Sequence, residues 1–521
     1  MRAERLFSIL GLVDPELIDE AMVSNSAIRR RRAAVWGRYA AIAACCVVVC
    51  GALFWSVRFL GMGGGSDTAA TSESTAADTA EGADNSTAGG ADADSAAQEP
   101  ADSYMSYAGP VLPLTTLETG TGLTAERTLT LDFAPGIHAD GTSGQWGVQV
   151  TDRYLLTNPT GNDVTVTALY PVTGSLADLT AMAPQLTADG AAAEYMVYAG
   201  GYAGTFGDEN DRNGSTNNLA GPYGWEDYAA LVSDGNYLAD ALAGVPDLFT
   251  PVIVYDFSDV TVTEEADHPE LVVSCTFDPE ATTILSYDFS SSNWDDSGSW
   301  RQYGERINPD RWGTPTLIVL GADIDYALLA DYGLDAPALT GADCTVVRRE
   351  TTLGEALADL CRAELADREL TADVPLDQYK KAAAELLEEY GPLSDAPMDR
   401  YADGRLDDLL GEALTMDRVL YMAVPVNVPA GGSTEVTVSF WKQPSYDFGG
   451  SGTGREAFQG FELLTTAGSA LTFTGQSVCA VNTDGAALMG QDLRLDWENG
   501  AAAALDLNQP RYGLEIRPLD R

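Results

Sequence analysis

The residues best suited to chemistry in this 521-residue chain are oxygen-bearing side chains in one short segment, 207–214. Glu209, Asp211 and Asn213 recur at every second position and a glycine follows them, which is the spacing of the first ligands of a calcium-binding loop. Ala220 stands where such a loop carries its last acidic ligand. The pattern therefore indicates a weak calcium site, with a solvated acidic loop as the alternative.

Nucleophilic catalysis has little support in the sequence. The chain has only two histidines, His138 and His268, and both lie among polar turn residues, which is typical of solvated loop histidines. No G-x-S-x-G elbow and no H-E-x-x-H pattern occurs. The glycine-rich segment 449–455 lacks the Lys-Ser/Thr pair of a phosphate-binding loop. These observations favour a protein that is not an enzyme, and no catalytic residue is assigned.

Paired carboxylates remain a chemical alternative, because the chain contains 78 acidic residues. A glycoside hydrolase uses two such groups on either side of the scissile bond, but no spacing in this sequence selects a pair. Aromatic residues that could stack on sugars occur close together in the sequence: Trp294, Trp300, Tyr303 and Trp312. Anchoring of a loop or a β-sheet core is the alternative role for these rings.

An uncharged apolar run at residues 39–57 predicts one transmembrane helix. At ~1.5 Å per residue the run extends about 28 Å, close to the thickness of the hydrocarbon core of a bilayer. Arginines at 29–32 and Arg38 precede the run, whereas only Arg58 follows it closely, which predicts a cytoplasmic N-terminus. A cleaved signal peptide would need an unusually long basic segment, so an uncleaved anchor is favoured.

The segments on both sides of the run have distinct expected roles. Residues 1–38 form a short cytosolic leader, in which Leu17, Ile18, Ala21 and Met22 share one helix face. Because a segment of this size cannot bury its own core, residues 1–28 are a candidate site for a cytosolic protein partner. Residues 58–103 are rich in Gly, Ala, Ser, Thr and Asp, which predicts a disordered acidic linker.

The outer part, residues 104–521, is strongly acidic. The whole chain has 29 basic and 78 acidic residues, and its only lysines are Lys380, Lys381 and Lys442. This charge repels nucleic acid and excludes it as an expected partner.

Four cysteines lie beyond the apolar run, at Cys275, Cys344, Cys361 and Cys479. They show no C-x-x-C spacing, so zinc and redox motifs are not expected. Both buried free thiols and disulfides are compatible with the sequence, and buried free thiols are favoured.

Periodicity predicts an α+β fold for the outer part. Apolar residues alternate with polar ones in short strands, expected at 150–158, 164–171, 250–255, 271–277, 283–289, 316–320, 419–428, 434–441, 470–473, 493–497 and 514–516. Turns rich in Gly, Pro, Asn and Asp separate them, which is typical of one or two Ig-like β-sandwiches. Helical spacing predicts a pair of short helices at 225–242 and a helical insert at about 352–415.

Several segments together resemble one family. These are the leader segment 12–21 with its Val-Asp-Pro-Glu-Leu-Ile core, the segments 107–114 and 125–130, the predicted hairpin 150–171, and the tetrapeptides 225–228 and 445–448. They resemble uncharacterised membrane-anchored extracytoplasmic proteins of gut Firmicutes, and the leader is similar to that of anti-sigma-factor-like membrane proteins. The resemblance implies a location in the bacterial cell membrane with the C-terminal domain extracellular, and it implies no catalytic residues.

The expected function is therefore non-catalytic binding or sensing of an unknown extracellular ligand by a single-pass membrane protein. A surface glycan hydrolase with paired carboxylates and a structural envelope protein are the two alternatives.

Overall fold

The computed structural model describes residues 107–134, 136–137, 143–144, 147–204, 224–246, 248–261, 270–295, 298–306, 313–329, 343–371, 373–398, 400–448 and 457–519. The described part is mostly β-sheet, with a smaller helical content. The expected leader, span and linker at 1–38, 39–57 and 58–103 lie outside these ranges. Within the ranges, no helix combines the length and apolar character that crossing a bilayer requires.

The largest sheet has seven strands. In spatial order they are β24 (Ala503–Ala504), β22 (Thr472–Val481), β2 (Thr124–Asp132), β5 (Val148–Thr157), β19 (Ser433–Lys442), β7 (Gln185–Ala188) and β8 (Ala191–Ala192). All neighbours are antiparallel except β2 and β22, which are parallel. Val436, Val438 and Phe440 on β19 are buried, and the residues between them are only partly covered. The face predicted for this strand is confirmed.

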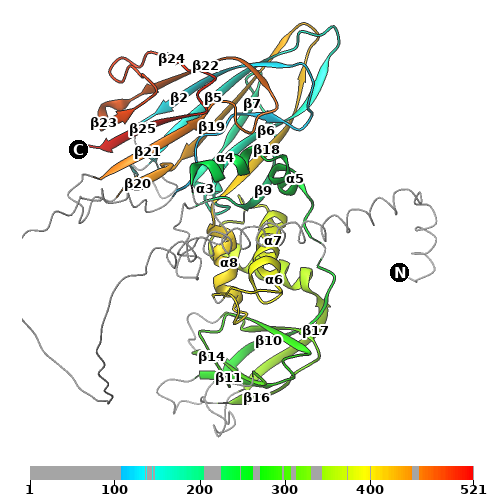
Figure 1. Ribbon diagram of the computed structural model, residues 1–521. Coiled ribbons are helices and arrows are strands. Elements are labelled where there is room, and N and C mark those ends of the chain that lie inside the picture. Colours follow the sequence, from blue (N-terminus) through cyan, green and yellow to red (C-terminus); the bar gives the residue numbers. More distant parts are fainter. Residues whose placement is uncertain are drawn as a thin grey trace, which may run out of the picture. The chain divides into compact units, whose positions relative to one another are not determined.

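Two four-stranded sheets complete this β-region (Figure 1). One contains β1 (Thr115–Thr116), β6 (Val164–Gly174), β18 (Arg418–Val428) and β9 (Met196–Tyr202); the other contains β20 (Tyr446–Phe448), β21 (Phe458–Leu464), β25 (Arg511–Pro518) and β23 (Ala486–Gln491). The ring of Tyr170 on β6 lies 6.3 Å from the ring of Tyr154 and 5.8 Å from that of Phe440, both on the seven-stranded sheet. These aromatic contacts join the sheet that contains β6 to the seven-stranded sheet through a shared core. A further hairpin pairs β3 (Gly136–Ile137) with β4 (Ser143–Gly144).

A long insertion separates two strands that are neighbours in one sheet. Leu420 on β18 pairs with Ala199 on β9, although more than 200 residues lie between them in sequence. Helices α4 (Trp225–Ser233) and α5 (Gly235–Leu242) come first in the described part of the insertion, which confirms the predicted pair of short helices. It continues into a second group of sheets and a group of helices.

The second group consists of two four-stranded sheets. Their strands are β12 (Thr282–Tyr287), β15 (Thr316–Gly321), β10 (Pro251–Thr261) and β17 (Asp343–Thr352) in one, and β13 (Ser291–Trp294), β14 (Trp300–Arg306), β11 (Glu270–Thr276) and β16 (Asp325–Leu329) in the other. Tyr255 and Phe257 on β10 belong to the core between these sheets, whereas Val252 and Val254 pack toward the helices. Because successive side chains point to opposite faces, β10 is buried on both sides.

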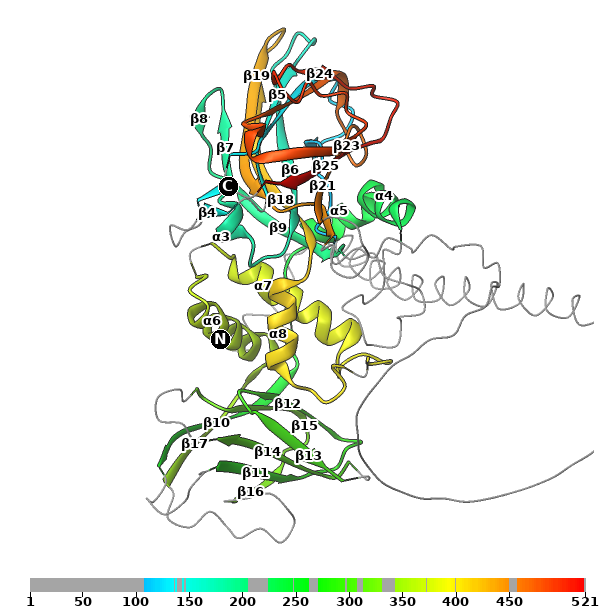
Figure 2. The same cartoon turned by 90° about the vertical axis from the view of Figure 1, so that its left-hand side faces the viewer.

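Three helices adjoin the sheet that contains β10, and the first and the last of them contact its strands (Figure 2). They are α6 (Leu353–Asp367), α7 (Leu376–Glu385), which continues as a π-turn over Leu386–Tyr390, and α8 (Leu406–Thr415). The Thr352 hydroxyl accepts a hydrogen bond from the Glu355 amide at 3.3 Å, so the helix α6 starts directly after β17 with a side-chain cap. These helices lie in the stretch where the sequence predicted a helical insert.

Some strand predictions are wrong in detail. Residues 493–497 are irregular, because Arg494 adopts a left-handed conformation with φ of 57°. Leu493 and Leu495 are nevertheless buried, which explains the misleading alternation. The strand predicted at 470–473 begins only at Thr472 and continues to Val481.

Candidate functional site

A pocket of about 600 Å³ opens where the short helix α3 (Leu179–Met182), the start of β9 and the start of α7 meet. A volume of this size suits a small organic ligand. Its lining comes from three separate segments: Leu179, Ala183, Pro184, Tyr195, Met196, Val197, Tyr198, Asp373, Pro375, Asp377 and Gln378. The lining thus combines apolar and aromatic side chains with two carboxylates and one amide.

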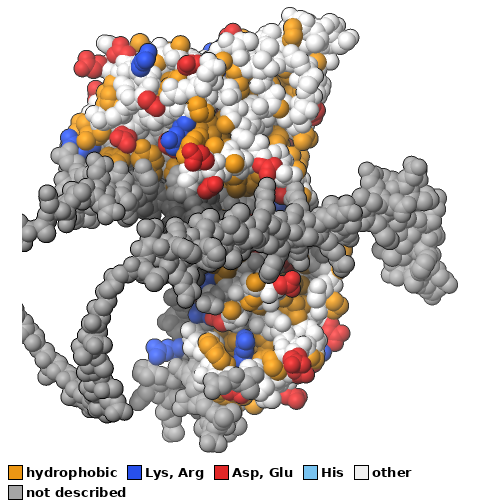
Figure 3. All heavy atoms as spheres, in the orientation of Figure 1, with side chains coloured by type: hydrophobic (Ala, Val, Ile, Leu, Met, Phe, Trp, Pro, Cys, Tyr) orange, Lys and Arg blue, Asp and Glu red, His pale blue; other side chains and the backbone are white. Residues whose placement is uncertain are grey.

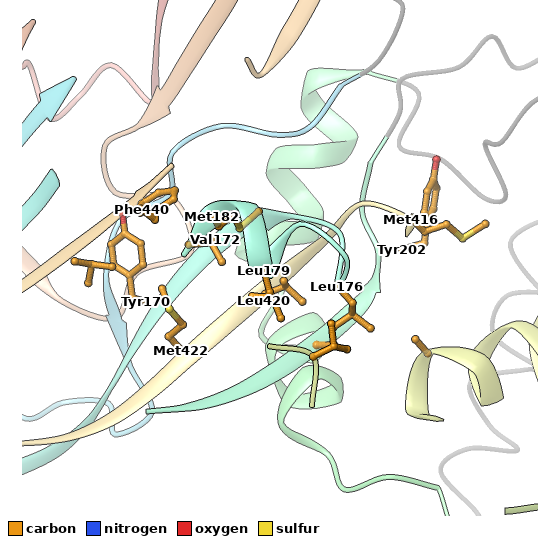
Figure 4. Close-up of a cluster of buried hydrophobic side chains, with 14 of the residues drawn as sticks. Tyr170, Val172, Leu176, Leu179, Met182, Tyr202, Met416, Leu420, Met422 and Phe440 are labelled. Carbon is orange, nitrogen blue, oxygen red and sulfur yellow. The ribbon is translucent and has the colours of Figure 1, made fainter. Parts of the chain in front are cut away.

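The floor of the pocket is part of the hydrophobic core. Leu179 and Met182 on α3 lie against Val172 of β6 and Leu420 of β18 (Figure 4). The helix α3 ends at Ala183, whose φ of 40° is left-handed and turns the chain toward Pro184. This floor is fixed by buried packing, so the shape of the pocket does not depend on surface side chains alone.

One wall is formed by α7, which packs along the edge strand β9. The Ala199 amide donates to Gln378 Oε1 at 2.8 Å, and the Tyr202 amide donates to Glu385 Oε1 at 3.2 Å. The Lys381 ammonium donates to the Ala199 carbonyl at 3.3 Å. An edge strand otherwise leaves such groups without partners. The side chains of α7 satisfy them and hold the wall in place.

Two cations at this wall, Lys381 and Arg418, are occupied by the fold. Lys381 Nζ also donates to the carbonyls of Asp240, Ala241 and Ala243 at the end of α5, at 2.5, 2.8 and 3.3 Å. Burial lowers the pKa of Lys381. Arg418 Nη1 donates to Glu385 Oε2 at 2.6 Å and to the Gly200 carbonyl at 3.0 Å. Neither cation lines the pocket.

Two polar groups of the pocket form hydrogen bonds with neighbouring residues. Thr180 Oγ1 donates to Asp373 Oδ2 at 2.9 Å, and the Tyr195 hydroxyl donates to the Pro184 carbonyl at 3.0 Å. Burial and the negative charge of Asp373 raise the pKa of Tyr195. Asp373 and Asp377 are solvent-exposed, and the side chain of Met196 at the rim is 63 % exposed. The site therefore presents negative charge beside aromatic and thioether surface.

Glu209, Asp211 and Asn213 lie outside the described residues, as do His138, His268, Trp312 and segment 449–455. Among the described residues, no group of three or more His, Cys, Asp or Glu side chains is arranged to hold a metal ion.

The aromatic residues around 294–303 do not form one platform. Trp294 on β13 is 57 % exposed, whereas Tyr303 on β14 is 1 % exposed and belongs to the core. Trp300 is half-buried, and its ring nitrogen donates to Ser274 Oγ at 3.0 Å. Core and anchoring roles therefore account for Tyr303 and Trp300, and Trp294 is the most exposed of these three described rings.

Sequence reasoning missed Tyr195, Tyr198, Asp373 and Asp377, because they come from segments almost 180 residues apart. The one local signal is the i, i+4 spacing of the two aspartates around Pro375, which by itself indicates only the start of a helix.

Comparison with protein-family models, with curated proteins and with solved structures finds no match to this chain.

Proposed function

We propose that this protein is a single-pass protein of a bacterial cell membrane whose extracellular part binds or senses a small ligand without transforming it. The observation that carries the binding role is the pocket between α3, β9 and α7, with its mixed aromatic, apolar and acidic lining. The membrane anchor rests on the uncharged run at 39–57 and its arginine-rich N-terminal flank.

The paired β-sheets are compatible with a binding role. Paired β-sheets, which we regard as Ig-like sandwiches, provide a rigid body on which loops and short helices can carry a site. A linker at 58–103 would hold that body near the outer surface, and a leader at 1–28 could report ligand binding to a cytosolic partner.

The experiment uses the full-length chain in nanodiscs of zwitterionic lipid. Thermal unfolding is followed while small glycans, peptides, amines and calcium are added one at a time. A ligand that stabilises the protein, and no longer does so when Met196→Asp and Tyr198→Leu are introduced into the pocket, supports the proposal. Stabilisation that persists in this variant would place binding elsewhere, and a complete lack of stabilisation would favour a structural envelope role.

A surface glycan hydrolase is the second candidate. Asp373 and Asp377 line the same pocket, and two carboxylates are what a glycosidase requires. The same protein is therefore incubated with each glycan of the panel, and new reducing ends are measured. Release of reducing ends that Asp373→Asn abolishes would replace the binding role by the hydrolase role.

Topology is tested on intact cells that express the full-length chain with an N-terminal epitope. Protease added outside the cells is expected to remove the part after the anchor and to leave the N-terminal epitope inside. Loss of the epitope would contradict a cytoplasmic N-terminus.

A further inference from the structure

The charges around the pocket are of one sign. Asp373 and Asp377 contribute carboxylates, and neither lysine nor arginine is among the lining residues. The chain as a whole carries a formal net charge of −49, and acidic side chains, with some basic ones among them, are scattered over the face drawn in Figure 3. Such a surface raises the local concentration of cations and lowers that of anions.

The nearby basic groups do not neutralise the two aspartates. Lys381 is held by four backbone carbonyls, and Arg418 is paired with Glu385. Lys380, the other lysine of α7, does not line the pocket. One oxygen of Asp373 accepts from Thr180, which fixes the orientation of this carboxylate at the site.

The uncharged part of the lining also suits a cation. The faces of tyrosine rings attract ammonium and guanidinium groups, and a methionine thioether adapts to aliphatic chains. Tyr195, Tyr198 and Met196 supply these surfaces, and Pro184 and Pro375 add rigid apolar walls. A ligand with a positive head and an aliphatic stem can therefore contact carboxylates and apolar surface at the same time.

We propose that the pocket between α3, β9 and α7 binds a small organic cation, in which an ammonium or guanidinium group is carried on an aliphatic stem. This inference rests on the proposed binding function and names its ligand class. Asp373 and Asp377 attract the head group, Tyr195 and Tyr198 contact it with their rings, and Met196 covers the stem.

Three probes of equal length test the charge requirement: cadaverine, 1,5-pentanediol and glutarate share a five-carbon backbone and differ in charge. Titration calorimetry is done on the full-length chain in zwitterionic nanodiscs, with empty nanodiscs as the blank. Cadaverine is expected to bind and to bind more weakly as salt is raised, because salt screens the attraction to exposed aspartates. The diol and the dianion are expected not to bind.

The variants separate charge from packing. Asp373→Asn and Asp377→Asn preserve size, and each is expected to weaken cadaverine binding about two- to fivefold, as for a single exposed charge contact. Asp367→Asn removes the same charge from an exposed position of α6 outside the pocket and should leave affinity unchanged. Tyr198→Leu should weaken binding, and Tyr198→Phe, which keeps the ring, should retain it.

Three results would overturn the inference: equal binding of the diol, unchanged affinity in the Asp373→Asn, Asp377→Asn double variant, or no binding of cadaverine at millimolar concentration. A different outcome would reject the cation and still support the proposed binding function. A neutral glycan or peptide whose binding is lost in Tyr198→Leu but not in the double aspartate variant would preserve the pocket as a binding site and reject the cation.

Discussion

Glu385 Oε2 accepts a hydrogen bond from Arg418 Nη1 at 2.6 Å, and this ion pair joins the last residue of α7 to the first residue of β18. The Arg418 side chain is 1 % exposed and that of Glu385 is 21 % exposed. Arg418 Nε and Nη2 are buried without a hydrogen-bond partner among the described residues. Glu385 is thus the carboxylate that compensates the buried guanidinium and holds the pocket wall against the sheet.

We predict that Glu385→Gln destabilises the protein by about 2–4 kcal/mol, because it leaves a buried positive charge without its counter-ion. The glutamine keeps an oxygen that can accept from the Tyr202 amide, so the loss reports mainly on charge. The free energy of unfolding is measured by denaturant titration. Asp367→Asn serves as the control, with an expected change below about 0.5 kcal/mol at its exposed position. Equal stability of the two variants would contradict the role of the ion pair.

A second buried pair lies inside the first β-region. Arg127 Nη2 is 2.7 Å from Asp152 Oδ2, and both side chains are at most 1 % exposed. The hydroxyls of Tyr154 and Tyr170 donate to the same Asp152 oxygen at 2.8 and 3.0 Å. Arg127 Nη1 also donates to the Leu464 carbonyl at 2.7 Å, so the network joins strands β2, β5, β6 and β21.

Asp152→Asn is therefore expected to cost about 3–5 kcal/mol of stability or to prevent folding, because this carboxylate accepts hydrogen bonds from three side chains, Arg127, Tyr154 and Tyr170. A milder variant keeps the prediction testable: Tyr170→Phe removes one donor and should cost about 1 kcal/mol. The matched control is the next residue on β5. Arg153 forms an exposed ion pair with Glu435, with side chains 51 % and 35 % exposed, and Arg153→Gln should cost less than about 1 kcal/mol.

Two buried titratable groups have shifted pKa values, and one of them, Asp417, gives the protein a predicted pH dependence. Burial is the main cause that raises the pKa of Asp417 to about 7, and burial lowers the pKa of Lys442 to about 8. Lys442 Nζ donates to Thr173 Oγ1 at 2.9 Å inside the fold. The unfolded chain has Asp417 ionised above about pH 4, whereas the folded chain keeps it protonated up to about 7. Stability from this group is thus full below pH 4 and is lost as the pH rises to 7.

Asp417→Asn should abolish that part of the pH dependence. We expect wild type to lose about 2 kcal/mol relative to the variant between pH 4 and 7, less than the full shift implies because the side chain is partly exposed. The free energy of unfolding is measured at intervals of half a pH unit, with Asp367→Asn as the reference. Parallel pH profiles of wild type and Asp417→Asn would show that Asp417 does not titrate in this range.

The sequence was sufficient for elements in which periodicity and burial agree. Val436, Val438 and Phe440 alternate on β19, and all three are buried as expected. The leucines of α6 and α8 repeat at helical spacing and form the buried faces of those helices. Local pattern decides such elements, because each one buries a single face.

Strands that bury few apolar residues were not predicted. β14 has the sequence WRQYGER and β17 contains Arg348, Arg349 and Glu350, so alternation is hidden by charges. These charges form ion pairs within the fold, such as Arg349 with Asp256 on β10 at 3.2 Å.

The pocket was missed for a different reason. Its segments meet because α7 packs on β9, and no local pattern reports a contact between segments almost 180 residues apart.

The four cysteines of the described region differ in burial. Cys275 and Cys361 are buried, Cys344 and Cys479 are half-buried, and all four are free thiols. Burial raises the pKa of both Cys275 and Cys361 to about 12, so these thiols are protonated at neutral pH and react slowly. Reductant is therefore expected to leave the melting temperature of the full-length protein unchanged, since no disulfide joins these residues.

Alkylation of the native protein followed by mass spectrometry gives the site-resolved measurement. Modification is expected first at Cys344 and Cys479, and at Cys275 and Cys361 only after denaturation, because access of the reagent follows exposure. Cys275→Ala and Cys361→Ala should each lower stability by about 1–2 kcal/mol through lost packing. A disulfide-linked peptide, or a clear fall in melting temperature with reductant, would contradict four free thiols and would place a covalent link in a fold that otherwise depends on its core and its buried ion pairs.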